Sequence, residues 1–159
     1  MVARPDDPKA LAGIAFELAQ MGQKREALAV FDRVIVIKPT WAEAHFDRGF
    51  LLQEMNNHDA AIEAFDRAIA LNPDHDRAFY GKALSLISTK RSDEAVASLQ
   101  RNTKLQPMSP FGWYQLARVQ FDRGKVDKAQ SIIDHLATFE PKVAAQLARE
   151  TGLRAPPRL

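Results

Sequence analysis

The chain has 159 residues, of which 46% are hydrophobic and 26% are charged, as expected for a soluble globular protein with a core. Its formal net charge of +2 is too small to favour nucleic acid or an anionic membrane as a partner. The lack of cysteine excludes disulfides, thiol catalysis and thiolate metal sites.

Helical hairpins are predicted along almost the whole chain. Near the start, Leu11, Ile14, Ala15 and Leu18 form the apolar stripe of one helix, and a second stripe follows a break at Gly22. The same pattern of two stripes around a break recurs three more times, and no strand pattern is present. In chain order, the expected helices span 8–21, 24–37, 42–55, 58–71, 76–89, 92–105, 110–123 and 126–138.

Several residue types recur at a fixed interval of 34 residues, which is the distance in sequence from Pro39 to Pro73. A period of about 20–50 residues is typical of solenoids and propellers. One hairpin cannot bury its own apolar face, whereas stacked copies can. The recurring positions are Pro39, Pro73, Pro107 and Pro141; Ala27, Ala61, Ala95 and Ala129; Phe31, Phe65, Leu99 and Ile133; and Ala15, Gly49, Ala83 and Ala117. Positions within a repeat are numbered below as slots, counted from Pro8, Ala42, Asp76 and Pro110.

The predicted helix ends carry recognisable capping signals. Thr40 and Glu43 have the spacing of a capping box, in which each side chain satisfies a free amide of the first turn. Asp7 and Ser109 each precede a proline, which suits an N-cap residue followed by proline at the first helical position. Each proline at slot 32 is expected to stop the second helix of its repeat.

These positions resemble the tetratricopeptide repeat, a 34-residue unit with small residues at slots 8 and 20, bulky ones at slots 4, 11 and 24, and proline at slot 32. The resemblance covers Pro8 to Val143 and implies an all-α fold, a TPR-type α-solenoid of antiparallel helix hairpins wound into a right-handed superhelix. It also implies a single domain over 1–159, with repeats 8–41, 42–75, 76–109 and 110–143. Three residues depart locally from the pattern: His45 at slot 4, Asn102 at slot 27 and Gln120 at slot 11.

One more helix is expected after the fourth repeat, at about 141–151, ending at Gly152. A terminal helix of a solenoid needs a polar outer face, and Gln146, Arg149 and Glu150 supply it. We therefore interpret this segment as a capping helix. The tail 153–159 is expected to be frayed and flexible.

The sequence offers little support for catalysis or metal binding. Its four histidines, His45, His58, His75 and His135, are not spaced as metal ligands, and its glycines are too isolated to cradle a phosphate. Ser85 and its neighbouring serines have no histidine close in sequence that would act as a base. We expect no enzyme activity, no cofactor and no bound metal. The chain also lacks a secretory signal and a membrane-spanning stretch, so we expect a cytoplasmic protein.

Large apolar residues also occupy the helix face that the core does not use, at slots 2, 5, 9 and 12 of the first helices. In tetratricopeptide arrays these slots line a concave groove that holds peptides or helices. Slots 5 and 12 can instead be half-buried against the next repeat, which is the alternative for Phe46, Tyr80 and Phe121. The expected groove residues are Phe16, Phe46, Phe50, Arg77, Tyr80, Leu84, Ile87, Phe111, Tyr114, Arg118 and Phe121. The charges near them are mixed and favour neither an acidic nor a basic partner.

Two specialised members of the family are excluded by residues at the groove slots. Chaperone adaptors of this family grip a C-terminal carboxylate with lysine, asparagine and arginine, and of these only Arg77 has a counterpart here. The asparagine ladder of the sugar-transferring members needs asparagine at slot 6, which carries Gly13, Asp47, Gly81 and Gln115.

The leading hypothesis is a non-catalytic interaction module or scaffold that binds an apolar peptide or helix of a partner protein. Arg77 and Arg118 would orient any acidic residue of that ligand. One alternative is a structural unit that self-associates into a homo-oligomer through its apolar face. Another is the solenoid part of a larger enzyme, whose chemistry would lie outside these residues.

Overall fold

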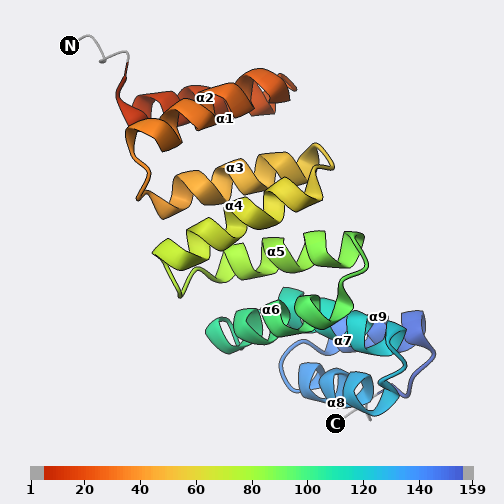
Figure 1. Ribbon diagram of the computed structural model, residues 1–159. Coiled ribbons are helices and arrows are strands. Elements are labelled where there is room, and N and C mark those ends of the chain that lie inside the picture. The colour runs from red at the N-terminus through yellow and green to blue at the C-terminus, as the bar shows by residue number, and fades with distance from the viewer. Residues whose placement is uncertain (1–5, 156–159) are drawn as a thin grey trace. The chain divides into compact units, whose positions relative to one another are not determined.

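The computed structural model describes residues 6–155, and these residues form nine helices and no strand (Figure 1). The helices are α1 (Pro8–Gln20), α2 (Lys24–Ile37), α3 (Ala42–Glu54), α4 (His58–Leu71), α5 (Asp76–Ser88), α6 (Ser92–Leu105), α7 (Pro110–Asp122), α8 (Val126–Ala137) and α9 (Pro141–Thr151). The eight repeat helices agree with the predicted bounds to within one residue at either end. The predicted all-α fold with repeated hairpins is confirmed.

The chain divides into two compact units, Met1–Ser85 and Leu86–Leu159, with the boundary inside α5. In the first unit, α1 packs against α2, α2 against α3, and α3 against α4. In the second unit, α7 packs against α6, α8 and α9, and α8 also packs against α9. The single domain expected over 1–159 stays a prediction.

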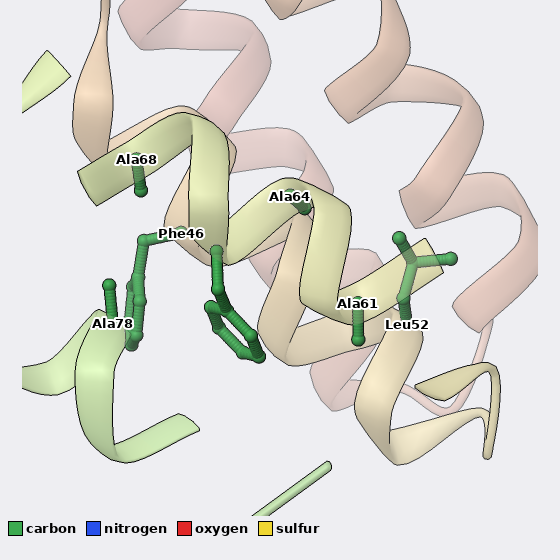
Figure 2. Packing of buried hydrophobic residues seen from close by; sticks show 7 residues of the cluster. Phe46, Leu52, Ala61, Ala64, Ala68 and Ala78 are labelled. Atoms are coloured by element: carbon green, nitrogen blue, oxygen red, sulfur yellow. The ribbon is translucent and has the colours of Figure 1, made fainter. Parts of the chain in front are cut away.

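The core of the first unit is built from small residues around one large ring, that of Phe65 in α4. Phe65 is fully buried, and a Cβ added at Gly49 or at Gly81 would lie 2.9 Å or 2.7 Å from its ring atoms. Helices α3 and α5 therefore approach this ring with bare backbone. Ala61, at slot 20, where all four repeats carry alanine, is also fully buried. Figure 2 shows Ala61, Ala64 and Ala68 of α4 in the same cluster as Phe46 and Leu52 of α3.

The turn between the two helices of each repeat uses one left-handed backbone position. Gly22, Asn56, Lys90 and Gly124 have φ of +81°, +60°, +60° and +78°, and all four stand at slot 15. Glycine adopts this conformation without steric cost, and asparagine tolerates it better than most residues. Lys90 adopts it although its side chain offers no such advantage, so the repeat geometry determines the turn there.

The predicted caps are only partly right. Asp7 is the N-cap of α1, and its side chain accepts a hydrogen bond from the Lys9 amide at 3.3 Å. The capping box at Thr40 and Glu43 is wrong, because the N-cap of α3 is Trp41 and no side chain caps this helix. Ser109 stands at the expected N-cap of α7 but makes no side-chain capping bond.

The three residues that depart from the repeat pattern are buried, and each has a local explanation. His45 is 6% exposed, and its Nε2 lies 2.8 Å from the carbonyl oxygen of Pro39, so the buried ring has a polar partner. Asn102 faces Gly112, where an added Cβ would clash with its Oδ1. Gln120 accepts a hydrogen bond from Arg123 at 3.0 Å. The hairpins accommodate these polar groups without losing their shape.

The segment after the fourth repeat begins differently from the earlier repeats. Pro141 is the first residue of α9, whereas the other slot-32 prolines stand two residues after the end of a helix. The helix ends at Gly152, whose φ of +74° is the left-handed C-cap conformation. Beyond it, the Arg154 backbone exchanges two hydrogen bonds of 3.0 Å with the Gln130 side chain, although fraying was expected from Leu153. Residues 156–159 of that predicted tail lie outside the described residues.

Candidate functional site

The predicted groove residues lie on one face of the first helix of each repeat, called the groove face below. In the first unit this face is strongly apolar and partly open, because Phe16 of α1 is 58% exposed and Phe50 of α3 is 49% exposed. Both stand at slot 9, where an ordinary amphipathic helix would carry polar residues. Tyr80 and Leu84 of α5 are half-buried.

Phe46 differs from the other groove residues of this unit, because it is only 8% exposed and belongs to the core cluster. Its ring centroid lies 5.8 Å from that of Phe65 and 4.9 Å from that of His75. The guanidinium of Arg77 lies 4.6 Å from the same centroid, at cation–π distance. In Figure 2, Phe46 points between α4 and α5, beside Ala78. Phe46 thus packs against the following repeat, as the alternative interpretation proposed.

Arg77 is already occupied by an ion pair within the unit. Its Nη2 lies 3.1 Å and 2.9 Å from the two carboxylate oxygens of Glu43 on α3. The same carboxylate lies 2.8 Å from Nε2 of His75, which is 4% exposed. Although it lies this close to the carboxylate, the Nε2 atom of His75 has no hydrogen-bond partner of suitable geometry. The guanidinium of Arg77 is therefore already paired with a carboxylate of the chain itself, in the absence of a peptide ligand.

Asp47 of α3, at slot 6, is a further carboxylate of this face. It is half-buried, and no hydrogen bond or ion pair within the described residues reaches it. Burial raises its pKa from 3.8 to about 6; the negative charge of Glu43 adds to the rise, and Arg77 opposes it. Sequence reasoning recorded Asp47 only as a residue that breaks the asparagine ladder.

The substitution Asp47→Asn is expected to stabilise the protein at pH 7.5 and to change little at pH 4. Because the folded-state pKa of Asp47 is raised, the folded state binds a proton more tightly than the unfolded state between about pH 4 and pH 6. The charged carboxylate therefore costs stability above pH 6, and this cost disappears as the pH falls below 4. Each pKa unit corresponds to about 1.4 kcal/mol, and partial exposure reduces the expected gain to about 1–2 kcal/mol.

Urea unfolding at the two pH values measures this difference. Glu63→Gln is the matched control, since Glu63 is an exposed carboxylate on α4, away from the groove face. An Asp47→Asn gain of equal size at pH 4 and pH 7.5 would show that the carboxylate charge is not its cause.

In the second unit, α9 occupies part of the groove face of α7. Glu150 of α9 accepts hydrogen bonds from the Tyr114 hydroxyl at 2.5 Å and from the Arg118 guanidinium at 2.7 Å. The bond from Tyr114 lowers the pKa of Glu150, and the same bond raises the pKa of Tyr114. Two predicted ligand contacts thus bind a carboxylate of the chain itself.

The remaining predicted residues of this unit divide by exposure. Phe111, the second residue of α7, is 67% exposed. Ile87 and Phe121 are half-buried, in keeping with packing against neighbouring helices. Phe111 is therefore the predicted groove residue with the most accessible apolar surface in the second unit.

Ser85 has a histidine partner that is distant in sequence. Nδ1 of His58, 27 residues earlier in the chain, is 3.1 Å from the Ser85 hydroxyl oxygen, and Gln53 donates to the same oxygen at 2.8 Å. Ser85 is fully buried, so the hydroxyl serves a hydrogen-bond network that joins α3, α4 and α5. Within residues 6–155, no group of three or more metal-ligating side chains comes together, and no helix is long and apolar enough to cross a membrane.

Comparisons of the sequence with known families identify the repeats. A family model described as "Tetratricopeptide repeat" matches residues 14–79. A second, described as "Anaphase-promoting complex, cyclosome, subunit 3", matches residues 54–136. A comparison with curated proteins finds no match.

Solved structures of tetratricopeptide proteins have the same fold. MamA is 22% identical with a TM-score of 0.79, and the alignment covers 93% of this chain and 82% of MamA. YrrB, a TPR protein with an unusual peptide-binding site, is 19% identical with a TM-score of 0.77, covering 94% and 80%. The first TPR of Spaghetti (RPAP3), bound to an HSP90 peptide, is 15% identical with a TM-score of 0.73, covering 77% and 97%. With its four 34-residue helical hairpins, the chain belongs to the tetratricopeptide repeat family.

Proposed function

We propose that the chain is a non-catalytic interaction module that binds an apolar segment of a partner protein on the groove face. The observation that carries this proposal is the exposure of large aromatic rings at groove slots. Phe16 and Phe50 are 58% and 49% exposed in the first unit, and Phe111 is 67% exposed in the second. Large apolar groups left exposed together on one face commonly mark an interaction site.

Two of the structural neighbours support a peptide as the ligand class, because YrrB has a peptide-binding site and the Spaghetti domain is bound to an HSP90 peptide. Peptide binding is a property of those two proteins, and for this chain it is part of the proposal. The groove slots of this chain carry aromatic and aliphatic residues in place of a carboxylate clamp, and Arg77 is paired with Glu43. We therefore infer an apolar ligand segment in an extended or helical conformation.

The apolar contacts of the first unit alone are enough for a modest affinity for a peptide. Burying a phenylalanine side chain contributes about 1.5–3 kcal/mol, and Phe16, Phe50 and Leu84 offer three such contacts in the first unit. Ordering the peptide and losing its free motion offset much of this gain. A dissociation constant in the micromolar range is therefore expected.

Selection of phage-displayed 12-residue peptides on the immobilised protein tests the proposal. The parent is expected to enrich peptides rich in Leu, Ile, Phe or Met, and Phe50→Ser is expected to weaken their binding at least fivefold. Phe111→Ser tests the second unit in the same way. Circular dichroism establishes that each variant retains its helices.

Val36→Ser is the matched control, because Val36 is 82% exposed on α2 and lies outside the groove face. Selected peptides that bind both phenylalanine variants as tightly as the parent would locate the binding surface elsewhere. Loss of helicity in Phe50→Ser would instead show that this ring supports the fold.

A further inference from the structure

The carboxylate of Asp47 indicates which residue types the partner segment carries. This inference rests on the proposed peptide-binding function. Asp47 stands four residues after Glu43 and three before Phe50 on α3. Side chains at these spacings are neighbours on a helix surface, with Cβ atoms about 5–6 Å apart. The half-buried carboxylate therefore lies next to the exposed ring that is the main apolar contact of the first unit.

Two cations close to Asp47 in the repeat, Arg77 and the adjacent Arg48, make their ion pairs with other carboxylates. Arg77 of α5 pairs with both oxygens of Glu43, and Arg48 of α3 donates from Nε to Asp32 of α2 at 2.7 Å. Glu43, on the same helix, places a second negative charge beside Asp47. A half-buried carboxylate costs free energy unless an opposite charge or hydrogen-bond donors compensate it. Arg77 opposes the rise in the pKa of Asp47, but its guanidinium bonds to Glu43, and no hydrogen bond or ion pair within the described residues is made to Asp47.

We propose that Asp47 binds the side chain of a lysine or arginine in the partner segment, while an apolar residue next to that cation packs on Phe50. The recognised sequence is thus an apolar residue beside a basic one. This replaces the earlier expectation that Arg77 orients an acidic ligand residue, because Glu43 already occupies Arg77. A cation at this position would offset the negative charge of Asp47, which lies beside the carboxylate of Glu43, and this attraction is the source of the selectivity.

The peptide selection described above provides the test when it is repeated on Asp47→Asn. Peptides selected on the parent at pH 7.5 are expected to be enriched at least threefold in lysine or arginine beside an apolar residue, relative to the starting library. This enrichment should vanish on Asp47→Asn and persist on the control Glu63→Gln. Binding that depends on Phe50 but shows no basic enrichment would overturn this inference and leave the proposed function intact. Selection that is indifferent to Phe50 would overturn both.

A double-substitution cycle with one selected peptide sharpens the result. Replacing its basic residue by glutamine is expected to weaken binding to the parent about five- to tenfold, measured by fluorescence anisotropy at pH 7.5. The same replacement should change binding to Asp47→Asn less than twofold. At pH 5 the parent should also lose its preference, because Asp47, with a pKa of about 6, is then mostly protonated, whereas lysine and arginine stay charged. An equal loss of affinity in parent and variant would contradict the pairing.

Discussion

Phe65→Ala is expected to lower the free energy of unfolding of the first unit by about 3–5 kcal/mol, the usual cost of removing a fully buried ring. Phe65 has no solvent exposure, and its ring contacts the glycine backbones of α3 and α5. These backbones cannot move into the space left by the ring without displacing whole helices. The cavity should therefore stay largely open, which places the cost towards the upper end of the range.

Phe16→Ala is the matched control, since it makes the same chemical change in the same unit at a ring that is 58% exposed. Its effect on stability is expected to stay within about 0.5 kcal/mol. Urea unfolding followed by circular dichroism measures both variants. Similar losses for the two substitutions would contradict the assignment of Phe65 to the core and of Phe16 to the open face.

The fold was predictable from the sequence because the same signals for helices and turns occur in each of the four repeats. Apolar stripes and a break between them recur in every repeat, and a proline follows the second helix of the first three, so an ambiguous signal in one copy is resolved by the others. Lys90 illustrates this: nothing about lysine indicates a left-handed turn, yet its place 34 residues after Asn56 does. The sequence marked Asn102 only as a departure from the pattern, and its contact with Gly112 is shown by the structure alone.

The ion pairs of the site were missed, because capping signals were interpreted within single helices. Glu43 has the spacing of a capping residue, but it pairs with Arg77, which stands at the same slot of the next repeat. A second signal was present as well. Arg48 with Asp32 and Lys82 with Asp66 form the same pair of slots in two successive repeats, each at 2.7 Å. Aligning charges across repeats, as was done for apolar residues, would have found these pairs.

The role of Glu150 could not be derived from slot numbering. Helix α9 starts at Pro141, three residues before a fifth repeat would begin, so its residues do not align with the slots of the other first helices. Only the folded structure shows that its carboxylate meets Tyr114 and Arg118. A residue whose slot predicts exposure on the groove face can thus be covered by a helix that does not follow the repeat pattern.

Leu147→Ala is expected to lower the free energy of unfolding of the second unit by about 2–4 kcal/mol. Leu147 of α9 has no solvent exposure, and α9 packs against both α7 and α8. Truncating a fully buried leucine loses its burial and leaves a cavity. Because α9 is a short helix of 11 residues, it depends on tertiary packing for its own stability. The substitution should therefore loosen the whole helix, and with it the contacts of Glu150.

Hydrogen exchange of the α9 amides, together with urea unfolding, measures this effect. Met108→Ala is the control in the same unit, because Met108 is a large apolar residue that is 67% exposed and should tolerate truncation. If Leu147→Ala leaves both the unfolding curve and the α9 exchange rates unchanged, α9 does not form part of the core of the second unit. If instead α9 exchanges faster while α7 and α8 remain protected, the helix unfolds as a separate element, and Tyr114 and Arg118 then become available to a partner's carboxylate.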